Sequence, residues 1–205
     1  MVFIDNLAYS LFAISFAGFL LLYTALSMYL SYRRKQGSFA DQLRGAGVPL
    51  GLLGVYMLLM GLWGQFTWPL PGSYNMLFYD PLVSFGIVLL AFCLSVKYNV
   101  KLEYAGFLSL MAGLMAIGYG AVGYNLGLTQ APIALLGMYL LYGLAGVFAY
   151  PVSLIADRLP GLRNRNAWLG WHAILIIFCL LVFLASALSA FVAISAIPAH
   201  LLSAP

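Results

Sequence analysis

The chain has 205 residues, of which 64% are hydrophobic and only 7% are charged. Soluble domains carry roughly 25% charged residues, so this composition excludes a water-soluble domain and predicts a surface that faces lipid. The net charge of +4 comes from Lys and Arg beside hydrophobic segments, where such residues set topology and contact anionic lipids. We therefore expect a lipid bilayer around the chain and no nucleic-acid partner.

Six apolar segments predict six membrane-spanning helices. A helix of about 20 apolar residues crosses the roughly 30 Å of hydrocarbon in a bilayer. The predicted fold is all-α, with one transmembrane domain over residues 1–205. The predicted spans are residues 7–31, 46–66, 80–96, 104–126, 132–156 and 167–193.

The basic residues predict which loops face the cytoplasm. Lys and Arg are retained in cytoplasmic loops, and here they fall in the loops 32–45, 97–103 and 157–166. Both termini and the loops 67–79 and 127–131 then lie outside the cell membrane. The basic residues are Arg33, Arg34, Lys35, Arg44, Lys97, Lys101, Arg158, Arg163 and Arg165.

The outer loop 67–79 is aromatic and carries no charge. Its two prolines and its glycine argue against a continuous helix. It is either an aromatic anchor at the membrane interface or a vestibule over a pore. Asp80 and Pro81 follow, and we expect Asp80 to cap the third span with Pro81 at its first helical position.

Glycines in the second and fourth spans predict close helix packing. Those of the fourth span recur every seven residues, and those of the second also share one helix face. Glycine lets two helices approach closely in lipid, where packing replaces the hydrophobic drive. The predicted packing residues are Gly47, Gly51, Gly54, Gly61, Gly106, Gly113, Gly120 and Gly127.

Polar side chains in and between the spans are candidates for a solute path. Hydroxyl and amide groups inside a bilayer need hydrogen-bond partners. They either bond neighbouring helices or line a path for a small neutral solute. The candidates are Trp63, Gln65, Tyr74, Asn75, Asp80, Asn125, Tyr139, Tyr142 and Tyr150.

A short string occurs twice and suggests an inverted repeat. Leu-Pro-Gly-x-x-Asn occupies residues 70–75 in an outer loop and 159–164 in an inner loop. These loops correspond if spans one to three and four to six are inverted copies. Such a 3+3 repeat is typical of transporters.

The sequence contains no motif for catalysis, cofactor binding or metal binding. Nucleophile elbows, phosphate loops and zinc motifs are absent, and no acidic residue lies clearly in mid-membrane. The two histidines, His172 and His200, lie about 42 Å apart along a helix, which rules out a bis-histidine haem within one chain. We predict that the protein is not an enzyme, with no metal and no cofactor.

The stretch from Tyr74 to Pro81, Tyr-Asn-Met-Leu-Phe-Tyr-Asp-Pro, opens a hydrophobic helix. It resembles a family of mainly archaeal integral membrane proteins of unknown function, and the likeness covers most of the chain. The family has no assigned activity, so this resemblance implies a compartment and no chemistry. A looser likeness is to the amide and urea channels, which also have six spans and open the third with an aromatic-Tyr-Gly-Pro string. Here Asp80 replaces that glycine, and the acidic, histidine-rich outer loop of the proton-gated channels is absent.

Two functional hypotheses follow from these patterns. The first is a passive channel or transporter for a small neutral solute, formed within each protomer of a homo-oligomer. The alternative is a non-catalytic structural or accessory subunit of a larger membrane complex, such as a respiratory assembly.

Overall fold

The structure is a computed structural model with six α-helices in its described part. Each helix is long and apolar enough to cross a membrane, which confirms the all-α, six-span prediction. The described residues are 6–34, 39–129, 131–162 and 170–203. The helices are α1 (Asn6–Arg34), α2 (Phe39–Thr67), α3 (Ser73–Lys97), α4 (Glu103–Asn125), α5 (Pro132–Leu162) and α6 (Gly170–Ser203).

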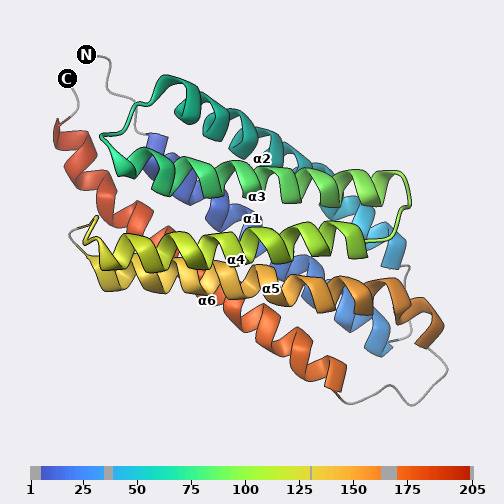
Figure 1. The fold of residues 1–205 in the computed structure, drawn as a ribbon. Coiled ribbons are helices and arrows are strands. Elements are labelled where there is room, and N and C mark those ends of the chain that lie inside the picture. The colour runs from blue at the N-terminus through green and yellow to red at the C-terminus, as the bar shows by residue number, and fades with distance from the viewer. Residues whose placement is uncertain (1–5, 35–38, 130, 163–169, 204–205) are drawn as a thin grey trace.

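The helices form a closed ring in chain order. Each packs against its neighbours along the chain, and α1 packs against α6. The most extensive contacts join α2 to α3 and α4 to α5; Figure 1 shows these two pairs with α1 and α6 crossing behind them. The start of α1, the end of α6 and the α2–α3 connection share one end of the ring. We call this the outer end, after the topology predicted from the basic residues, and the opposite end the inner end.

Helix α3 begins earlier than expected. It starts at Ser73 after Gly72, whose φ of 53° lies in the left-handed region that glycine tolerates. Most of the segment 67–79, in which no continuous helix was expected, is therefore helix, and Asp80 does not cap the third span. Pro81 lies inside α3 and cannot donate a backbone hydrogen bond to the Leu77 carbonyl four residues before it. The Tyr139 hydroxyl of α5 donates to that carbonyl instead.

The glycine faces hold the two helix pairs together. A Cβ added at Gly113 of α4 would lie 2.9 Å from the backbone nitrogen of Val147 in α5. A Cβ added at Gly61 of α2 would lie 2.9 Å from the backbone nitrogen of Val83 in α3. Gly47, Gly51 and Gly54 likewise face α3, and Gly106 and Gly120 face α5.

Gly127 does not belong to this packing face. Helix α4 ends at Asn125, and Gly127 follows with a φ of 60° and nothing within 4 Å of an added Cβ. The Leu128 N–H bonds to the Gly123 carbonyl at 3.1 Å, so Gly127 closes the end of the helix in the way typical of glycine. The prediction that it packs against a helix was wrong because the seven-residue pattern runs past the end of α4.

Some sequence predictions fall on residues outside the described ranges. The basic residues Lys35, Arg163 and Arg165 are among them, and so is the end of the second Leu-Pro-Gly-x-x-Asn string. The described basic residues belong to the inner end; they are Arg33, Arg34, Arg44, Lys97, Lys101 and Arg158. The inverted repeat and the side of the membrane that each end faces stay predictions.

Single cysteines will test the predicted orientation. Ser73 and Val100 are exposed at opposite ends of α3 and its flanking turn, so Ser73→Cys and Val100→Cys are suitable once Cys93 and Cys179 are replaced by alanine. We expect a membrane-impermeant thiol reagent to label Ser73→Cys in intact cells, and Val100→Cys only after permeabilisation. The reverse labelling pattern would show that the ring has the opposite orientation.

Candidate functional site

A hydrogen-bond network joins three helices in the outer half of the ring. Gln65 Nε2 on α2 donates to Asp80 Oδ1 on α3 at 2.9 Å, and the Tyr119 hydroxyl on α4 donates to Asp80 Oδ2. Both carboxylate oxygens thus accept a bond from a neighbouring helix. Tyr119 was not among the candidate site residues, although a tyrosine within a span signals a hydroxyl that needs a partner.

Asn75 fixes the α2–α3 connection. Its side chain is 0% exposed, its Nδ2 donates to the Gly64 carbonyl at 2.9 Å, and its Oδ1 accepts from the Leu70 N–H at 3.3 Å. These bonds satisfy the amide at both ends and tie the short connection to α2. Asn75 therefore acts as a structural clamp in this conformation.

The remaining candidates contact different neighbours. The Trp63 ring packs against Tyr79, and Tyr74 stacks on Phe78. On α5, Tyr142 packs edge-on against Phe85, with ring centroids 5.6 Å apart.

Tyr150 and Asn125 lie elsewhere. Tyr150 packs against Phe107 of α4, and Asn125 is exposed at the end of α4. Of the nine candidates, only Tyr142 lines the central cavity. Whether the others conduct a solute stays a prediction.

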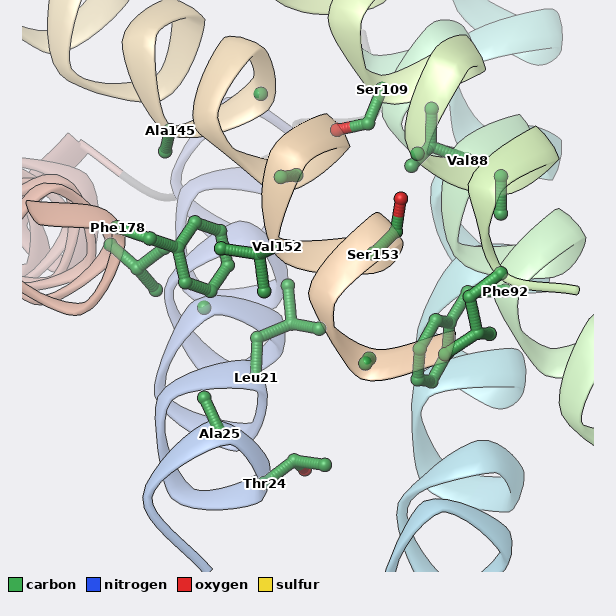
Figure 2. A pocket seen from close by; sticks show the side chains of 18 of the residues that line it. Leu21, Thr24, Ala25, Val88, Phe92, Ser109, Ala145, Val152, Ser153 and Phe178 are labelled. Atoms are coloured by element: carbon green, nitrogen blue, oxygen red, sulfur yellow. The ribbon is translucent and has the colours of Figure 1, made fainter. Parts of the chain in front are cut away.

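The centre of the ring holds an elongated apolar cavity. Its volume is about 190 Å³, and all six helices contribute to a lining that is almost entirely carbon. Figure 2 shows Leu21, Val152 and Phe178 converging from α1, α5 and α6, with Ser109 and Ser153 among the few hydroxyls nearby. An engineered apolar cavity of about 150 Å³ stays dry and takes up benzene, so this cavity suits hydrocarbon better than water.

The cavity runs from the inner end toward the middle of the membrane. Trp171 lines it near the start of α6, and Val182 lines it further along the same helix. Eleven residues of helix separate them, which corresponds to about 16 Å. On the other helices the lining extends as far as Ile14 of α1 and Tyr142 of α5, so the cavity is elongated along the helices. It can hold an extended apolar chain.

Charged groups surround the inner end of the cavity. Arg33 donates to the Tyr29 hydroxyl at 3.3 Å, and its guanidinium lies 6.0 Å from the centre of the Tyr29 ring. Asp157 of α5 accepts hydrogen bonds from the backbone N–H groups of Leu102 and Glu103, both at 3.0 Å, and so caps α4. This cap could not be predicted from sequence, because it links residues far apart in the chain.

The described residues contain no group of three or more His, Cys, Asp or Glu side chains that could hold a metal ion. His172 stacks on Trp171 at a centroid distance of 3.9 Å, and the side chain of His200 lies outside the described part. The absence of a cofactor stays a prediction.

Comparison with known proteins matches the chain to a protein family. The family described as "Protein of unknown function (DUF981)" matches residues 1–203. No curated protein and no solved structure matches the chain.

Proposed function

The chain belongs to the DUF981 family, and we propose that this integral membrane protein holds a lipid-soluble molecule in its central cavity, without catalysis. In this role it is an accessory protein of the membrane, acting as a homo-oligomer or within a larger complex. The observation that carries the proposal is the apolar lining of a cavity to which all six helices contribute.

The polar groups of the outer half support the same conclusion. The Asp80 carboxylate is bonded by Gln65 and Tyr119, and the Asn75 amide is bonded at both ends. A polar solute in the apolar cavity would lose its bonds to water without gaining partners, at a cost of roughly 2–7 kcal/mol for each amide or hydroxyl. An apolar molecule has no such cost.

Passage of a small neutral solute remains a second candidate. The closed ring of helices favours it, because a cavity at the centre of a ring lies on the shortest path across the membrane. This path requires the Gln65–Asp80–Tyr119 network to open at the outer end.

Permeability and ligand retention together test the two candidates. We expect liposomes containing the protein to take up small amides and polyols at the rate of protein-free liposomes, measured by stopped-flow light scattering. Detergent-permeabilised vesicles give the upper limit of the uptake rate. We also expect organic extraction of the purified protein to release a lipophilic compound in about a 1:1 ratio, identified by mass spectrometry. Faster uptake together with an empty cavity would favour the channel and contradict the accessory role.

A further inference from the structure

The shape of the central cavity restricts its occupant to a linear chain. The cavity extends about 16 Å along α6 within a volume of about 190 Å³. A compact molecule would leave one end empty. A single hydrocarbon chain of a membrane lipid has an extended shape and the required polarity, and the surrounding bilayer supplies it.

The inner end of the cavity has an aromatic and basic rim, which we define as Tyr29, Arg33 and Trp171. Tyr29 and Trp171 both line the cavity, and their rings pack edge-on with centroids 6.1 Å apart. Arg33 is exposed, beside the Tyr29 hydroxyl. The rim therefore places a positive charge where a chain would leave the cavity.

The acidic side chains Asp157 and Glu103 have partners other than Arg33. The Asp157 carboxylate is bonded to the start of α4, and Glu103 is paired with Lys101 at 3.5 Å. Arg33 makes no ion pair with a described side chain. Basic residues at the membrane surface attract anionic lipids, and an arginine fork suits phosphate oxygens.

We propose that the cavity binds one chain of an anionic phospholipid from the adjacent leaflet, with the lipid phosphate beside Arg33. This inference rests on the proposed function and specifies its ligand. The chain fills the apolar cavity toward Val182, and the glycerol region lies against the packed Tyr29 and Trp171 rings. The headgroup contacts Arg33 at the membrane surface.

Fluorescence of Trp171 provides the test. Trp171 is 3% exposed, so lipids outside the ring contact it little, while a chain in the cavity lies against it. A variant with Trp63→Phe, Trp68→Phe and Trp168→Phe retains Trp171 alone. It is reconstituted in vesicles of equal parts phosphatidylglycerol and phosphatidylcholine, with bromines on the chains of one lipid or of the other. Bromine content and surface charge are then the same in both.

We expect brominated phosphatidylglycerol to quench Trp171 more strongly, with a preference of about fivefold, the effect of one basic residue at an anionic surface. Arg33→Gln should remove this preference, and Arg34→Gln, one residue along, should retain it. Ala25→Leu fills the cavity (Figure 2) and should reduce quenching by both lipids. Ala173→Leu, on the exposed face of α6, should not.

Equal quenching by the two lipids in the parent protein would overturn the anionic headgroup, as would a preference that survives Arg33→Gln. If such quenching still falls with Ala25→Leu, an apolar occupant remains and the proposed function stands. If neither lipid quenches Trp171 and extraction releases no lipophilic compound, both the lipid inference and the proposed function are overturned. Ala145→Leu, also in the cavity lining, replaces Ala25→Leu if size-exclusion chromatography shows that the latter does not fold.

Discussion

Replacing Gly113 with leucine is expected to lower the free energy of unfolding by about 1–3 kcal/mol or more, the range for overpacking a tight contact. An added Cβ would lie 2.9 Å from the Val147 backbone nitrogen and close to the Gly143 carbonyl oxygen. These neighbours are backbone atoms of α5, which cannot rotate away as a side chain can. The helices must separate, and the α4–α5 contact is the most extensive in the ring.

Gly118 provides the matched control on the same helix. Nothing lies within 4 Å of a Cβ added there, so Gly118→Leu should leave the stability unchanged or raise it slightly through better helix propensity. Thermal unfolding in detergent, followed by circular dichroism, measures both variants. A melting temperature for Gly113→Leu equal to that of Gly118→Leu would show that α4 and α5 do not pack closely at this point.

The number of helices and the packing faces could be predicted from sequence because both depend on local patterns. An apolar run long enough to cross a bilayer can be recognised without knowing its neighbours. Glycine spacing similarly indicates which face of α4 can pack closely against another helix. The start of α3 could not be predicted in this way. Pro81 argues against a helix interior, and the donor to the carbonyl that this proline leaves free is the Tyr139 hydroxyl, which comes from a distant helix, α5.

The candidate site was less predictable, because the conspicuous polar residues are not the ones that form the cavity. Gln65, Asn75 and Asp80 are noticeable in an apolar sequence, and the structure places them in interhelical bonds. The cavity is lined by small and aliphatic residues from all six helices. Ala25 and Ala145 are ordinary in a membrane span, and their role depends on how the ring closes.

Tyr139→Phe should lower the free energy of unfolding by about 1–2 kcal/mol, the range found for interhelical hydrogen bonds in membrane model peptides. Its hydroxyl is the donor for the Leu77 carbonyl, which has no helical N–H partner because residue 81 is proline. Removing the hydroxyl leaves a buried acceptor unsatisfied. Tyr142→Phe is the control one turn along α5, because its hydroxyl faces the Ser186 and Ser189 side chains and bonds no backbone carbonyl in the described part of the chain; we expect a smaller loss of unfolding free energy.

Pro81→Ala supplies the decisive comparison. The substitution restores an N–H that can donate to the Leu77 carbonyl. Tyr139→Phe should therefore lower the free energy of unfolding clearly less in the Pro81→Ala background than in the parent protein. A double-mutant cycle of unfolding free energies in detergent measures this coupling, expected between about 0.5 and 3 kcal/mol for residues that share a partner. Additive effects would show that the Tyr139 hydroxyl does not replace the missing backbone donor. Positive coupling would show that Pro81 is tolerated inside a membrane helix because a tyrosine on another helix satisfies the carbonyl it leaves free.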